Sequence, residues 1–257
     1  MRVAAPWRVF APPASKARAI ALYRGIADAG DELVKMGDLA DIGVATNWGQ
    51  ALELYKLGLE HVLLCECGYL GNRSMWCSLS WDGLNGRGLH ALAPERPEPH
   101  LEPWKGERAG YALVLGQVPS DWAVKIALGG KSYDEWLTLT CQRLVTLGHE
   151  VRYRAHPEVT MLDHTLTKQP PSLREELEGA RLAVTLNSTA AIEAVCAGVP
   201  TWVFDERGSM AAPVAGLYSE PANRREWVND LARRQWSLDE LETGRAWRAV
   251  RSLLAQL

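Results

Sequence analysis

The residues best suited to chemistry follow short apolar runs, where buried strands are expected to end. In the second half of the chain these positions carry amide, basic and hydroxyl side chains: Gln117, Arg154, His156, Asn187, Ser188 and Thr189. Such groups bind phosphate through charge and hydrogen bonds. Glu193, one turn further along, is placed to accept from ribose hydroxyls. We therefore predict that these seven residues bind a nucleotide diphosphate.

The segment 181–204 predicts the elements that position three of these residues. Its pattern indicates a strand at 182–186, a helix at 190–197 and a second strand at 201–204. Asn187, Ser188 and Thr189 would open the helix, where free backbone N–H groups favour a phosphate. An ordinary β–α–β unit with a good N-cap has the same pattern. Because parallel strands end at one edge of a sheet, the polar strand ends should gather into a pocket.

The first half offers carboxylates that could act as a general base. Glu66 follows the apolar run from His61, and Asp82 opens a glycine-rich turn. Glu66 is preferred, because weak solvation at the end of an apolar strand makes a carboxylate a better base. Asp121 in the second half is the third choice. For each of them the alternative is a carboxylate that caps or stabilises a turn.

Residues beside these carboxylates are candidates for acceptor binding, either as flat rings or as hydrogen-bond donors. They are Tyr69, Arg73, Trp81, Asn85 and Arg87. Aromatic rings also belong in cores, and arginines are common on solvated surfaces. We predict an acceptor-binding group here, with core packing of the aromatics as the alternative.

The composition is that of a globular protein, with 47% hydrophobic and 23% charged residues in 257. A net charge of −3 gives no general basic signature of a nucleic-acid binder. Five scattered cysteines suit a reducing compartment, and we find no metal-binding spacing and no long apolar run. We expect a cytoplasmic protein without a metal or other cofactor.

The distribution of prolines predicts two α/β domains. Pro94, Pro97, Pro99 and Pro103 interrupt the pattern before β–α alternation restarts at Tyr111. We predict an N-terminal acceptor-side α/β domain at 1–100 and a C-terminal nucleotide-binding domain at 106–257. The last helix is free to pack back on the first domain, and we expect the two Rossmann-like domains to face a cleft.

The second half resembles a known family. The stretch from Asn187-Ser-Thr to Gly198-Val-Pro200 resembles the donor-binding segment of two-domain glycosyltransferases of the GT-B type. With His156-Pro157 before it, it is similar to the His-Pro and Ser/Thr motifs of capsule-type and sialyl- or Kdo-transferases. The resemblance spans roughly residues 111–207. The chain lacks the E-x7-E pair of longer relatives.

The first half resembles small phage-encoded glycosyltransferases. The resemblance lies in 66–73 and in Ser78-Leu-Ser-Trp-Asp82-Gly-Leu-Asn85-Gly. It implies transfer from a nucleotide sugar, such as a UDP-sugar, to the 5-hydroxymethyl group of 5-hydroxymethylcytosine in phage DNA, in the cytoplasm of the host. Trp81 or Tyr69 would then fill the gap that a flipped base leaves.

Three other functions remain open at this stage. The first is a capsule or surface-polysaccharide glycosyltransferase, and the second is a sugar-nucleotide epimerase. The third is a nucleotide-binding module without catalysis. The residues themselves indicate a nucleotide-sugar transferase, whereas the DNA acceptor follows from the resemblance alone.

Overall fold

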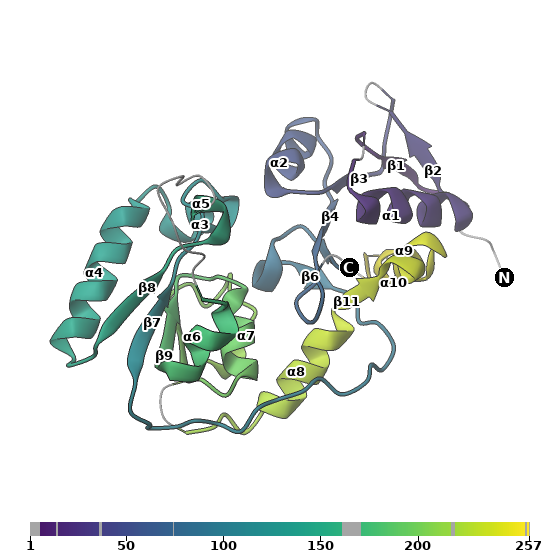
Figure 1. Ribbon diagram of the computed structural model, residues 1–257. Coiled ribbons are helices and arrows are strands. Elements are labelled where there is room, and N and C mark those ends of the chain that lie inside the picture. The colour runs from purple at the N-terminus through teal and green to yellow at the C-terminus, as the bar shows by residue number, and fades with distance from the viewer. Residues whose placement is uncertain are drawn as a thin grey trace. The chain divides into compact units, whose positions relative to one another are not determined.

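The computed structural model describes residues 6–13, 15–35, 38–73, 75–160, 171–216, 219–254 and 256. The chain forms two compact units (Figure 1). Unit 1 consists of residues 1–98 and 229–257, and unit 2 of residues 99–228. The predicted class, an α/β fold of two Rossmann-like units, is confirmed.

Within the described residues, unit 1 contains a seven-stranded sheet in the order β11-β5-β4-β3-β1-β2, with β6 on β5. Strands β1 to β4 are parallel, whereas β5 runs antiparallel to β4 and also pairs antiparallel with β6 and β11. The strands are β1 (Arg8–Phe10), β2 (Glu32–Val34), β3 (Ile42–Ala45), β4 (Val62–Cys67), β5 (Trp76–Trp81), β6 (Leu89–His90) and β11 (Gln235–Ser237).

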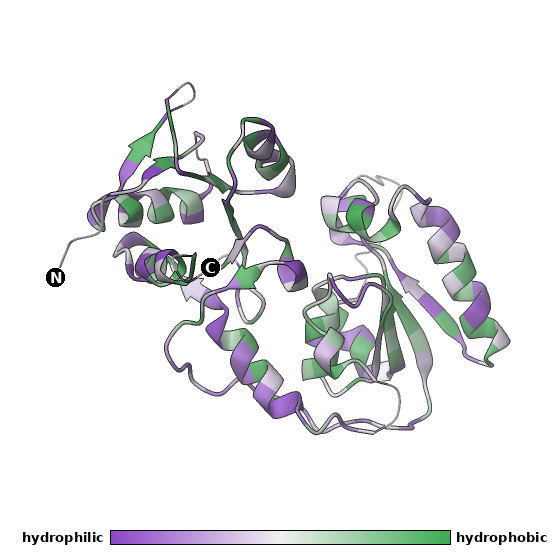
Figure 2. Ribbon diagram, turned by 180° about the vertical axis from the view of Figure 1, so that it is seen from behind, coloured by the Kyte–Doolittle hydropathy of each residue, from purple (hydrophilic) through white to green (hydrophobic). Residues whose placement is uncertain are grey.

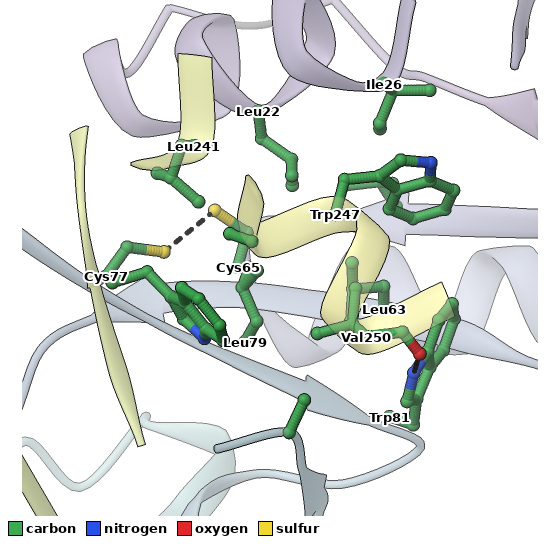
Figure 3. Close-up of a cluster of buried hydrophobic side chains, with 14 of the residues drawn as sticks. Leu22, Ile26, Leu63, Cys65, Cys77, Leu79, Trp81, Leu241, Trp247 and Val250 are labelled. Atoms are coloured by element: carbon green, nitrogen blue, oxygen red, sulfur yellow. Dashed lines mark hydrogen bonds between the residues drawn. The ribbon is translucent and has the colours of Figure 1, made fainter. Parts of the chain in front are cut away.

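Helices cover both faces of this sheet because its strands are apolar on both sides. The helices of unit 1 are α1 (Ala17–Asp28), α2 (Trp48–Lys56), the short η1 (Asn85–Arg87), α9 (Leu238–Glu242) and α10 (Arg245–Leu254). On one face, Leu22 and Ile26 of α1 meet Trp247 of α10 over β4 and β5 (Figure 3). The sulfurs of Cys65 and Cys77 lie 3.2 Å apart in the same core. Helix α2 contributes to the core on the other face.

The predicted second domain, 106–257, extends beyond unit 2, which ends at Val228. The last helix does belong to unit 1, but the return to this unit begins at Asn229 and includes β11 and α9 as well as α10. Asp31 anchors this segment, because its carboxylate accepts from the Trp247 indole at 2.7 Å and pairs with Arg251. Helix α9 also packs so closely on α1 that a Cβ on Gly25 would lie 1.9 Å from the Leu241 oxygen.

The described residues of unit 2 form four parallel strands in the order β10-β9-β7-β8. They are β7 (Tyr111–Leu115), β8 (Val151–Arg154), β9 (Ala180–Thr185) and β10 (Thr201–Val203). Both faces of this sheet pack against helices, and the two central strands, β7 and β9, are largely hydrophobic (Figure 2). The helices are α3 (Trp122–Leu128), α4 (Tyr133–Thr146), α5 (Pro157–Thr160), α6 (Leu173–Gly179), α7 (Ala190–Cys196), η2 (Ala212–Val214) and α8 (Arg224–Arg233), which runs on into unit 1. The predicted strand–helix–strand at 181–204 is thus confirmed as β9, α7 and β10.

The second part of the proline-rich stretch, from Pro99 on, is bonded to the rest of unit 2. Its backbone donates from Glu102 to the Cys196 oxygen at 2.9 Å and from Lys105 to the Gly198 oxygen at 2.7 Å. The guanidinium of Arg224, only 3% exposed, donates to the Glu102 and Val195 oxygens at 2.8 Å each. Arg224 therefore joins this extended segment to the carboxyl end of α7.

We predict that Arg224→Met lowers the free energy of unfolding by roughly 3 kcal/mol or more. A hydrogen bond from a charged group contributes about 1.5–3 kcal/mol, and this change removes the guanidinium bonds to the Glu102, Val195 and Cys196 oxygens. Urea denaturation gives the value. The matched control is Arg225→Met, which changes an exposed neighbour on the same helix and should stay within about 0.5 kcal/mol of the native protein. Equal losses in both variants would show that Arg224 has no special role.

Candidate functional site

The carboxyl edge of the unit 2 sheet brings the predicted phosphate-binding residues together. Gln117 follows β7, His156 follows β8 and Asn187 follows β9. Because all four strands are parallel, these ends share one edge. The chain goes from β7 outward to β8 and then back across to β9, so the topological switch point lies between β7 and β9. Ligands of open α/β sheets bind at such points.

A buried amide pair joins the two strand ends at the switch point. The Gln117 side-chain nitrogen donates to the Asn187 side-chain oxygen at 2.8 Å, and the Gln117 oxygen accepts from the Asn187 backbone N–H at 3.1 Å. The Asn187 side-chain nitrogen donates to Asp205 at 2.8 Å and to the Ala123 oxygen at 3.0 Å. Together these bonds connect the loops after β7, β9 and β10 with α3.

These contacts correct the predicted roles of Gln117 and Asn187. Their side chains are 7% and 3% exposed, and their polar groups are already bonded within the protein. A buried amide is stable only with such partners. The two residues therefore hold the strand-end loops in place and do not present their side chains to a ligand.

Ser188 and Thr189 are the more accessible members of the predicted group. Both are half-buried at the start of α7, and Thr189 occupies the N-cap position without a side-chain cap bond. The Ser188 hydroxyl oxygen accepts from the Ala190 N–H at 3.2 Å. Its proton can still be donated outward. Glu193 is exposed on α7, one turn beyond them.

The end of β8 is more crowded than its sequence suggests. Arg154 forms an ion pair with Glu176 and donates to the Pro171 oxygen at 2.6 Å. A phosphate would have to compete with Glu176 for this guanidinium. Arg154 is therefore less suited to bind the nucleotide sugar than its sequence position predicts. The His156 ring is half-buried, and its Nδ1 accepts from the Glu158 N–H at 3.2 Å.

Asp121, in the loop after β7, lies within electrostatic range of this histidine. Burial raises the pKa of the Asp121 carboxyl, and the negative charge of Glu158 raises it further. His156 and Lys125 act in the opposite direction. Asp121 is at the N-cap position of α3 but makes no side-chain cap bond. Carboxylates with such shifts are typical of functional sites, so Asp121 stays a candidate beside Glu66.

Sequence reasoning missed the part played by Tyr133 and Thr185. The Tyr133 hydroxyl accepts from the Gln117 backbone N–H at 2.8 Å, and the Thr185 hydroxyl donates to the Leu115 oxygen at 3.2 Å. In the sequence, Tyr133 occupies an apolar position at the start of an amphipathic stretch. The N-cap at Ser132 was the available signal, because it fixes the start of α4 at this residue.

In unit 1 the two predicted catalytic carboxylates lie at opposite edges of the sheet. Each ends a strand, but β5 is antiparallel to β4. Asp82 therefore sits beside Val62 at the amino end of β4, whereas Glu66 is near the carboxyl end, about 13 Å further on at about 3.3 Å per residue. One ligand at the carboxyl edge cannot reach both.

The surroundings of the two carboxylates also differ. Asp82 accepts from Tyr55, His61 and the Val62 N–H, each at 2.8 Å, so its carboxylate already stabilises a turn. This geometry does not support Asp82 as the base. Glu66 is 31% exposed and lies 4.0 Å from the Arg18 guanidinium.

The predicted acceptor-binding residues also differ in their burial and in their place in unit 1. Tyr69 and Trp81 are 4% and 1% exposed, so both are core residues and not stacking surfaces. The Trp81 indole donates to the Val250 oxygen at 2.9 Å (Figure 3). Asn85 and Arg87 lie in η1, in the turn that follows Asp82. Arg73 is exposed near the Glu66 edge, where its Nε donates to the Gly68 oxygen at 3.0 Å.

The comparisons with known proteins match one segment of unit 2 and the fold of most of the chain. Residues 149–222 match a family model described as "Putative glycosyltransferase (DUF6716)". The fold is similar to the solved structure "Thermosulfurimonas dismutans KpsC, beta Kdo 2,7 transferase", with a TM-score of 0.52 and 16% identity. That similarity covers 93% of this chain and 89% of the other. A comparison with curated proteins gives no match.

Two further properties bear on the site. Among the described residues, no helix combines the length and apolar character needed to cross a membrane. In the same part of the chain, no three His, Cys, Asp or Glu side chains gather in a way that could hold a metal ion.

We predict that Asn187→Asp destabilises unit 2 by about 2 kcal/mol or more. The change replaces a buried amide donor by an acceptor that faces the Asp205 carboxylate and the Ala123 oxygen. Thermal or urea unfolding measures the loss. Asn223→Asp, at an exposed asparagine of the same unit, is the control and should be nearly neutral. A loss no larger than that of the control would contradict the role of the amide pair.

Proposed function

We propose that the protein is a glycosyltransferase that binds a nucleotide-sugar donor at the carboxyl edge of unit 2. The observation that carries this proposal is the match of residues 149–222 to a glycosyltransferase family model. This segment contains His156, which follows β8, and Ser188 and Thr189, which follow β9, all at the carboxyl edge of one parallel sheet. The fold similarity to a Kdo transferase supports the same class.

The geometry suits stabilisation of a phosphate leaving group. The Ser188 and Thr189 hydroxyls lie at the start of α7, beside the switch point, and His156 supplies a ring nitrogen from the end of β8. Donors held in place before reaction stabilise developing negative charge without further rearrangement. The Gln117–Asn187 pair would contribute indirectly, by fixing the loop that carries the two hydroxyls.

For the acceptor, we propose a carbohydrate hydroxyl, as in a capsule or surface polysaccharide. The similar solved structure is described as a Kdo 2,7 transferase, and this favours a sugar acceptor. The 5-hydroxymethylcytosine acceptor and the phage origin remain predictions from sequence resemblance. The burial of Tyr69 and Trp81 removes the two side chains expected to fill the place of a flipped base.

A transfer assay tests the proposed function directly. The protein is incubated with a panel of nucleotide sugars, including UDP- and CMP-linked ones, together with oligosaccharide acceptors or hydroxymethylated DNA. Mass spectrometry then identifies the products. Transfer to an oligosaccharide supports the proposal, and transfer to DNA would restore the other acceptor. Isomerised donor without transfer would indicate an epimerase, and binding without turnover a nucleotide-binding module.

We predict that His156→Ala and Ser188→Ala each weaken donor binding by roughly ten- to a hundredfold. A hydrogen bond to a charged group contributes about 1.5–3 kcal/mol, which corresponds to this range. Calorimetric titration with the donor found in the transfer assay measures the effect. His149→Ala, in the same unit but before β8, is the control and should bind normally. Unchanged affinity in both test variants would refute the assignment.

We also predict that Glu66→Gln lowers turnover on the order of a hundredfold and leaves donor affinity almost unchanged. Loss of a general base removes proton transfer but no phosphate contact. Asp82→Asn should retain turnover and lose stability instead, because its carboxylate supports a turn at the other edge. If Glu66→Gln is fully active, the base lies elsewhere, and Asp121→Asn is the next variant to assay.

A further inference from the structure

Unit 2 contains a cavity that is lined by residues other than the predicted phosphate-binding ones. Its volume is about 390 Å³, within the range of small-molecule sites. The loop after β7 contributes Pro119, and α3 contributes Val124 and Leu128. Tyr133, at the start of α4, also lines the cavity, and its hydroxyl accepts from the Gln117 N–H. The cavity therefore adjoins the hydrogen bonds of Gln117 and Asn187, but Ser188, Thr189 and His156 do not line it.

The polar lining of this cavity is predominantly basic. Lys125 and Lys131 contribute two ammonium groups, and Asp134 contributes one carboxylate. The Lys125 ammonium lies 4.8 Å from the centre of the Trp122 ring, which holds it against α3. It also acts electrostatically on Asp121 in the preceding loop. Two cations against one anion favour a negatively charged ligand.

The loop between α3 and α4 leaves room for a ligand to approach the backbone. Gly129 and Gly130 adopt φ values of 58° and 91°, which side chains rarely tolerate. A Cβ on either residue would meet no atom within 4 Å, so packing within the protein does not require glycine there. The Ser132 hydroxyl accepts from the Glu135 N–H and keeps its own proton for donation into the cavity.

We propose that this cavity is a second anion site, which binds a phosphate group through Lys125 and Lys131 while the attached body packs against Val124, Leu128 and Tyr133. The phosphate is part of the donor nucleotide or is free inorganic phosphate. The nucleotide form rests on the proposed function, because a nucleotide-sugar donor is the ligand expected at this edge. A nucleoside diphosphate carries two phosphates, so it can supply anions to two neighbouring sites.

Calorimetric titration of the full chain tests this proposal, with UDP, CMP and inorganic pyrophosphate as probes. The test variants are Lys131→Glu and the double variant Lys125→Ala with Lys131→Ala, all at exposed positions where folding should be preserved. The matched control is Arg143→Ala, which removes one positive charge from the exposed side of α4, away from the cavity. Circular dichroism checks that every variant is folded.

We expect the double variant to bind the nucleotides at least tenfold more weakly and Arg143→Ala to bind within twofold of the native protein. The native affinity should fall with added salt, and the double variant should show a smaller fall. Loss of pyrophosphate binding together with nucleotide binding supports a site for phosphate itself. Loss of nucleotide binding alone supports a site for the donor.

Other outcomes separate this inference from the proposed function. If the protein transfers sugar and the lysine variants bind every probe with native affinity, the anion site is refuted and the glycosyltransferase proposal stands. If no probe binds the native protein, the anion site is refuted directly. If phosphates bind through the lysines but no nucleotide sugar is turned over, the site stands as a free phosphate site and the proposed function fails.

Discussion

The hydrogen bond between the side chains of Gln117 and Asn187 is the contact on which the candidate site most depends. It joins the ends of β7 and β9, the two strands between which the chain reverses direction across the unit 2 sheet. Because both amides are buried, each requires the other, and neither could be replaced by an apolar residue without leaving an unsatisfied polar group. The loop that carries Ser188 and Thr189 is thereby held at a fixed place.

The direction of the strands decides which residues share a site. Unit 2 is wholly parallel, so residues far apart in the sequence meet at one edge. Unit 1 changes direction at β5, which separates Glu66 from Asp82 although only fifteen residues lie between them. A carboxylate at the end of a strand is therefore informative only when the direction of that strand is known. Burial then removes Tyr69 and Trp81 from any surface, since both serve the core of unit 1.

The path of the chain is a second constraint on the structure, because residues 229–257 at the C-terminal side complete unit 1. Gln235 of β11 accepts from the Tyr69 and Leu70 N–H groups at 2.8 and 3.0 Å, which fixes the loop that follows Glu66 and β4. Asp31 holds α10 by its bond to Trp247. The surroundings of Glu66 thus depend on a segment more than 160 residues away in the sequence. No local pattern signals such a return.

The sequence by itself determined the α/β class, the β9–α7–β10 unit and the polar character of the unit 2 strand ends. Periodicity, capping residues and glycine positions are local properties, and they specify local elements. Only the tertiary structure decided that Gln117 and Asn187 bond to each other, that Arg154 is paired with Glu176, and that β11 returns to unit 1. Those outcomes depend on which strands become neighbours and in which direction they run. Strand pairing is set by the burial and hydrogen bonding of the whole chain, so it cannot be read from any one segment.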